Sequence, residues 1–166
     1  MNIRARKILE SAVDYMKAAN VLNHSSVQHP ALLLPSQVNA ALSLELYFKS
    51  LYQLLFGEDF KVKGNHSHDF YKIYKALPDE MRKRMNDNFD SLVQARDNSD
   101  VKQLRAESKV NISLKLEPLI QNWSRVFTKM RYVHENHKGS YVMILFPEIA
   151  KVVGMEIYSI DREILS

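Results

Sequence analysis

The segment ALSLELYFKSLYQLLFG, residues Ala41 to Gly57, decides the fold. Apolar residues fall on nearly every side of a helix drawn through it, which is typical of a helix at the centre of a bundle. Ser36, just before the segment, is a good N-cap residue, and Gly57 suits the C′ position that follows a helix. The pattern therefore predicts a central helix from Gln37 to Phe56.

Two charged residues interrupt this apolar helix. Glu45 and Lys49 lie one turn apart on the same face. Because an unpaired charge in a protein core is costly, both side chains need partners. Two interpretations stay open: the two residues form a pair that specifies the packing of the bundle, or they line a polar pocket that faces Arg131.

The composition predicts a single domain, residues 1–166, with long helices. Hydrophobic residues make up 46% of the 166 residues and charged residues 25%, which is ordinary globular composition. Only 4 Gly and 5 Pro are present, so the chain has few turns and its elements are long. We expect an all-α, up-and-down bundle of about five or six helices, with no sheet.

Hydrophobic spacing places further helices on both sides of the central one. They are expected at Ile3–Leu22, His68–Leu77, Asp79–Arg96, Ser113–Asn136 and Pro147–Ile164. The segments Asn23–Pro35 and Glu58–Ser67 are expected as loops, and Asn98–Asn111 as a mobile, partly helical connection. Tyr141–Phe146 is expected to be extended and exposed, and its apolar side chains, with the helix after Pro147, predict homodimerisation.

Several classes of site are excluded by what the sequence lacks. With no Cys, a disulfide scaffold, a thiolate zinc site and a Cys nucleophile are impossible. There is also no Gly-rich phosphate loop, no Ser-His-Asp order and no pair of catalytic carboxylates. We therefore expect no cofactor.

The six His residues raise the question of a metal site. The pairs His66 with His68 and His134 with His137 have spacings that zinc sites use. Without Cys or a nearby acidic pattern, however, no bound metal is expected. His68 is interpreted as helping Asp69 to cap the helix that follows.

Charge and hydropathy favour a cytoplasmic protein without a membrane contact. The N-terminus lacks the apolar region of a signal peptide, and the longest apolar run, Val142–Phe146, is too short to cross a bilayer. The net charge of +4 is compatible with RNA binding, but the basic residues are spread along the chain, as on ordinary solvated faces.

Three pieces, in order, resemble the HEPN superfamily of helical domains. They are the segment Ala41–Gly57, the sequence HDFYKIYKAL at His68–Leu77 and the sequence MRYVHENH at Met130–His137. The resemblance implies a cytoplasmic helical bundle that often dimerises. Catalytic HEPN members are metal-independent ribonucleases that carry an Arg followed about four to six residues later by a His.

Arg131 and His137 match that catalytic spacing and are the candidate catalytic residues. RNA cleavage without a metal needs a base, an acid and a cation, and His and Arg are suited to these roles. With one such His in each chain, two protomers would pool their residues. Glu45, Lys49, His134 and Glu135 form the supporting polar cluster.

A structural interpretation of the same residues stays open. Tyr132 stands where catalytic members carry a small polar residue, and the form Arg-Tyr-x-x-Glu is similar to HEPN-like domains without nuclease chemistry. On a regular helix Arg131 and Glu135 share a face, whereas His137 lies roughly 120° away from Arg131. Arg131 then pairs with Glu135 or with Glu45.

These features lead to two hypotheses for the function. The first is an RNA-directed module of microbial defence or toxin–antitoxin type, acting as an endoribonuclease. The alternative is a non-catalytic scaffold that binds a protein or a nucleotide, including an accessory domain for a nucleotidyltransferase partner encoded nearby. That last possibility rests on fold-level analogy.

Overall fold

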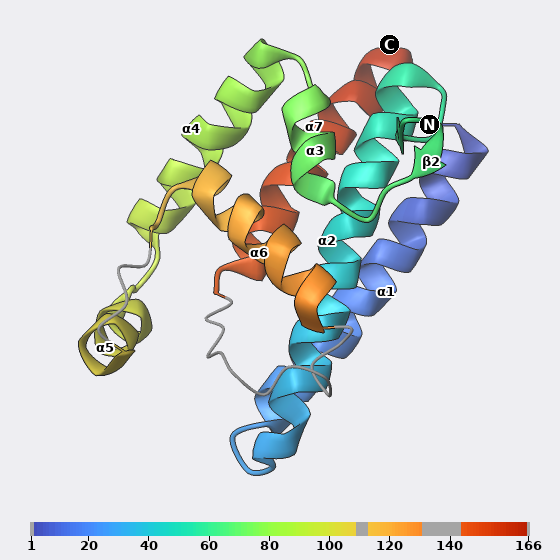
Figure 1. The fold of residues 1–166 in the computed structure, drawn as a ribbon. Helices are drawn as coiled ribbons and strands as arrows, with labels where there is room; N and C mark the ends of the chain where they lie inside the picture. The colour runs from blue at the N-terminus through green and yellow to red at the C-terminus, as the bar shows by residue number, and fades with distance from the viewer. Residues whose placement is uncertain (1, 109–112, 131–143, 166) are drawn as a thin grey trace.

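The computed structural model describes residues 2–108, 113–130 and 144–165, and this part of the chain is an all-α bundle (Figure 1). Its helices are α1 (Ile3–Ser25), α2 (Leu33–Phe56), α3 (Phe70–Ala76), α4 (Asp79–Ala95), α5 (Ser99–Ser108), α6 (Leu116–Met130) and α7 (Phe146–Leu165). The predicted fold class is confirmed. One short 3₁₀ helix, η1 (Pro30–Leu32), lies between α1 and α2.

Helix α2 is the central element, as its apolar sequence predicts. It packs against α1, α3, α6 and α7 (Figure 1). Leu44, Phe48 and Leu51 on this helix are completely buried. The Phe48 ring stacks on Phe70 and meets Tyr74 edge-on, with ring centroids 5.9 Å and 6.2 Å apart. These aromatic side chains belong to the core.

A repeated hydrogen bond joins α1 to α2. Three buried serines on α2, spaced by seven residues, each donate their hydroxyl to the carbonyl of a buried alanine on α1. The bonds run from Ser36 to Ala19, from Ser43 to Ala12 and from Ser50 to Ala5, at 2.9, 2.7 and 2.8 Å. Because two helical turns take about seven residues, the small side chains stay on one seam and the two antiparallel backbones approach closely.

The start of α2 differs from the prediction. The helix begins at Leu33 instead of Gln37, and Ser36 lies inside it instead of capping it. Pro35 falls in the first turn, where a missing N–H group has no intrahelical acceptor to lose. The loop is correspondingly shorter than predicted, since α1 continues to Ser25. At the other end, Gly57 has a φ of 73° after the last turn, as predicted.

A small hairpin lies in the segment expected to be a plain polar loop. The strands β1 (Lys61–Val62) and β2 (Asn65–His66) pair in antiparallel orientation. Lys63 and Gly64 form the turn with φ values of 51° and 81°, the left-handed conformation that two-residue hairpin turns require.

The entry into α7 is buried, which corrects one expectation. Leu145 and Phe146 lie in the core instead of on an exposed strip. Trp123 of α6 contacts Phe146 edge-on and donates its indole N–H to the Ile144 carbonyl at 2.9 Å. Residues 141–143 lie outside the described residues.

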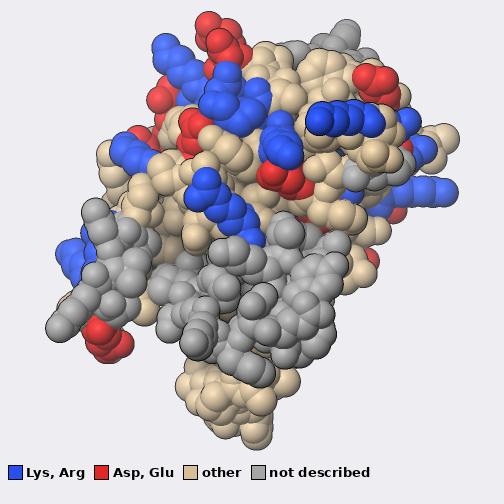
Figure 2. Space-filling view, in the orientation of Figure 1, with Lys and Arg blue, Asp and Glu red and all other residues tan. Residues whose placement is uncertain are grey.

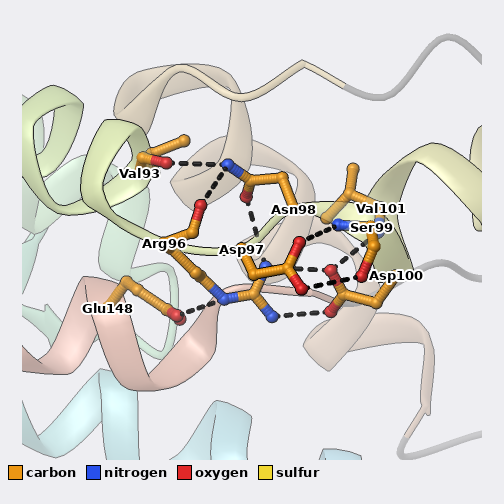
Figure 3. Close-up of polar contacts among 8 residues, drawn as sticks. All are labelled: Val93, Arg96, Asp97, Asn98, Ser99, Asp100, Val101 and Glu148. Atoms are coloured by element: carbon orange, nitrogen blue, oxygen red, sulfur yellow. Dashed lines mark hydrogen bonds and ion pairs between the residues drawn. The ribbon is translucent and has the colours of Figure 1, made fainter.

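Helix α5 occupies part of the segment expected as a partly helical connection. Arg96, at the end of α4, contacts both α5 and α7 (Figure 3). One guanidinium nitrogen of Arg96 donates to Asp100 at 2.6 Å, and its Nε lies 3.0 Å from Glu148 Oε1. Asn98 donates to the Val93 carbonyl at 2.7 Å. A single arginine thus ties three helices together.

The seam between α1 and α2 gives the first prediction. Ala12→Leu forces a large side chain between two close backbones and should destabilise the protein by about 1–3 kcal/mol. Ser43→Ala removes one hydroxyl bond and should cost about 1 kcal/mol. Ser91→Ala is the matched control, because Ser91 makes the same kind of bond on an exposed face. Urea unfolding measures all three, and equal effects for Ser43→Ala and Ser91→Ala would contradict the importance of the seam.

The second prediction concerns acid stability. The hydrogen bond from Arg96 lowers the pKa of Asp100 below its ordinary value. This contribution to stability is complete above the unfolded-state pKa of about 3.9 and is lost as pH falls through the lower folded-state value. Asp100→Asn should therefore reduce the unfolding free energy at pH 7, and its difference from wild type should shrink in acid below the unfolded-state pKa. A difference that stays constant throughout the acid titration would contradict this assignment.

Candidate functional site

The described residues include one part of the predicted site. Glu45 and Lys49 lie on α2, as expected. The residues Arg131, His134, Glu135 and His137 lie outside the described residues, so their roles stay predictions. The last described residue before them is Met130, at the end of α6.

Glu45 is the centre of a buried polar cluster. Its side chain is only 2% exposed, and its Oε1 accepts a hydrogen bond from Lys49 Nζ at 2.6 Å. The Nδ1 atom of His68 lies 2.9 Å from the same oxygen. Both charged residues on the apolar helix therefore have partners, as the cost of a bare buried charge requires.

His68 makes a contact that was not predicted. Asp69 provides the side-chain cap of α3, accepting from the backbone N–H of Lys72 at 3.3 Å. The imidazole of His68 contacts Glu45. No local pattern predicts this contact, because the two residues are 23 positions apart and meet only when α2 packs beside the start of α3.

Ser124 of α6 extends the cluster and was not singled out from the sequence. It is buried, and its hydroxyl donates to Asp69 Oδ1 at 2.7 Å. The backbone N–H of Tyr71 donates to the same hydroxyl at 3.4 Å. The start of α3 is thus held between α2 and α6, so that residues of three elements meet at one place.

A second polar contact fixes α3 against α6. Glu117 of α6 accepts hydrogen bonds from Tyr71 Oη at 3.0 Å and from Lys75 Nζ at 2.9 Å. The bond from Lys75 lowers the pKa of Glu117, and the same carboxylate raises the pKa of the Tyr71 hydroxyl. These shifts favour ionised Glu117, protonated Lys75 and neutral Tyr71, which is the arrangement the contact needs.

One atom of the cluster lacks a partner within the described residues. Glu45 Oε2 is buried and accepts no hydrogen bond from any of them. Such an atom loses its water without compensation, at a cost of about 1–3 kcal/mol. The cluster can therefore accept one more donor, of which a guanidinium or an ammonium group would bind most strongly.

On the face of the molecule that Figure 2 shows, positive and negative side chains are intermixed. In Figure 2, Lys and Arg side chains alternate with Asp and Glu side chains on the face that is shown. Lys75 pairs with Glu117 and Arg82 with Asp79. This arrangement is typical of ordinary solvated faces, on which exposed pairs contribute little.

Neither a metal site nor a membrane span is found in the described part of the chain. Residues 2–108, 113–130 and 144–165 contain no group of three or more His, Cys, Asp or Glu residues placed to hold a metal ion. None of the helices described there combines the length and the apolar character needed to cross a bilayer.

Comparisons with family models, with curated proteins and with solved structures found no match.

The third prediction tests the buried pair. Lys49→Met removes the ammonium group that pairs with Glu45. It should lower the free energy of unfolding by about 3–5 kcal/mol, nearer to the lower value. The double variant Glu45→Gln with Lys49→Met removes both charges and should recover much of that loss. Lys17→Met is the matched control, because Lys17 pairs with Asp14 in water and should change stability by less than about 0.5 kcal/mol. Thermal unfolding measures the series, and equal losses for Lys49→Met and Lys17→Met would contradict a structural pair.

Proposed function

We propose that this protein is a HEPN-like helical module of microbial defence or toxin–antitoxin type that cleaves RNA without a metal ion. One observation carries the proposal: Glu45 is buried on the central helix with one oxygen bonded and the other without a donor among the described residues. A carboxylate of this kind is suited to orient an arginine, because a guanidinium offers several donors in a fixed fork.

Arg131 is the arginine that the proposal assigns to this carboxylate. It follows α6 directly, and α6 already contributes Ser124 to the cluster around Glu45. An arginine that is oriented on one side by a carboxylate can present its remaining donors to a phosphate. His137 is then the group that exchanges a proton with the RNA.

A second function is favoured by the ion pair that Glu45 already forms with Lys49. A pair of this kind is typical of buried charges that specify the fold. In that case the protein is a non-catalytic scaffold for a protein or a nucleotide, or an accessory domain for a nucleotidyltransferase partner. We also propose homodimerisation, which the exposed Met155 and Tyr158 of α7 support.

The fourth prediction separates the two functions. If the proposal is correct, the wild-type protein should cleave RNA in the presence of a metal chelator. His137→Ala should abolish that cleavage while the unfolding free energy stays within about 0.5 kcal/mol of wild type, because a residue that works on substrate contributes little to packing. Arg131→Ala should also lose cleavage. RNA cleavage assays and urea unfolding measure both effects.

His29→Ala serves as the control, because His29 is exposed at the junction between α1 and α2. It should change neither cleavage nor stability. A wild-type protein that does not cleave RNA, together with an Arg131→Ala variant destabilised by about 3–5 kcal/mol, would favour the scaffold.

A further inference from the structure

We infer that a cavity between α1, α2 and the segment before β1 binds one backbone phosphate of a single-stranded RNA. The cavity has a volume of about 150 Å³, and its lining includes a positively charged side chain from α1 and another from α2. The inference rests on the proposed function, because it takes RNA as the substrate, and it adds a binding contact outside the HEPN-like Arg and His spacing.

Three elements form the wall of this cavity. Arg4 and Ile8 lie one turn apart on α1, Lys49 lies on α2, and Asp59 and Phe60 follow the end of α2. The serine and alanine seam fixes α1 against α2, so the backbones that carry Arg4 and Lys49 keep a set separation. The two cations are therefore placed by the packing of the bundle.

Both cations are oriented by a carboxylate and keep donors for a ligand. Arg4 pairs with Asp59, and Lys49 Nζ donates to Glu45 Oε1 at 2.6 Å. These are their side-chain acceptors within the described part of the chain. A guanidinium group has five N–H donors and an ammonium group has three, so each can also bind an anion.

The charge of the cavity favours a singly charged anion. The described residues that line it carry two positive charges, on Arg4 and Lys49, and one negative charge, on Asp59. A phosphodiester group of RNA carries one negative charge, which matches this excess of one. The apolar part of the wall suits the carbon atoms of a ribose, and the Phe60 ring is fixed there by its edge-on contact with Tyr52, at 5.1 Å between centroids.

Lys49 connects the cavity to the site of the proposed function. It lines the cavity and also donates to Glu45, the carboxylate from which that proposal starts. An RNA strand bound beside Glu45 therefore has the cavity one side chain away. A contact with a further phosphate positions the strand without reading its sequence.

The test measures binding of a 2′-O-methyl RNA oligonucleotide, which lacks the 2′-hydroxyl needed for cleavage, by fluorescence anisotropy at several salt concentrations. Arg4→Gln should weaken binding about tenfold. It should also lower the slope of log Kd against log salt by about 0.7, the value for one phosphate contact on a single strand. Arg6→Gln is the matched control, because it makes the same charge change on α1 at an exposed pair with Glu10, and it should leave the slope unchanged.

A second pair of variants should act in the opposite direction. Asp59→Asn removes the carboxylate from the cavity wall but keeps an oxygen that can accept from Arg4. It should tighten binding by about two- to fivefold, the effect of one partly exposed charge. Glu10→Gln removes a carboxylate from the exposed pair on α1 and should change binding little. Melting temperatures check that all four variants fold.

Four outcomes would overturn the inference: wild-type protein that does not bind the oligonucleotide, equal losses for Arg4→Gln and Arg6→Gln, weaker binding by Asp59→Asn, or displacement of the RNA by inorganic phosphate at an equal concentration of phosphate groups. Equal losses would mean that binding follows net charge alone, and displacement would mean that the cavity takes a free anion. Cleavage of unmodified RNA is measured separately. Binding through the cavity without cleavage would reject the nuclease and support the inference, whereas cleavage with unchanged binding by Arg4→Gln would reject the cavity alone.

Discussion

The close contact between α1 and α2 is the constraint on which the rest of the structure depends. Three serine hydroxyls reach three alanine carbonyls along one seam, and no larger side chain would let the two backbones come so near. With this side of α2 covered by α1, its opposite apolar side receives α3, α6 and α7 (Figure 1). The bundle therefore surrounds α2, and a charge placed on α2, such as Glu45, is buried by the elements around it.

That burial gives the Glu45 cluster its chemical character. In water a carboxylate and an ammonium interact weakly, but solvent screens a buried carboxylate such as Glu45 less, so its contact with Lys49 is stronger than an exposed pair would be. The same burial makes a carboxylate oxygen costly when it accepts no hydrogen bond, as is the case for Glu45 Oε2 among the described residues. A residue that only specified the fold would be expected to use both of its oxygens, so the proposed function starts from the Glu45 oxygen that has no donor among the described residues.

Much of the helical architecture could be predicted from local patterns. Gly57 marked the end of α2, and the apolar residues of α2 indicated a central position. Ser36 was misplaced because an N-cap and a serine that bonds to another helix look alike in sequence. Leu145 and Phe146 were expected at the surface, since the sequence does not show that this segment is buried in the bundle, with Phe146 against Trp123.

The sequence by itself determined the class of the fold, the central helix and the need of Glu45 and Lys49 for partners. These properties follow from the spacing of residues within one helix and from the cost of a bare charge in a core. Only the tertiary structure decided that His68 and Ser124 join the cluster. His68 lies 23 positions from Glu45, and Ser124 lies 55 positions from Asp69. Contacts at such separations depend on how helices pack, and helix packing depends on all the side chains at the interface together.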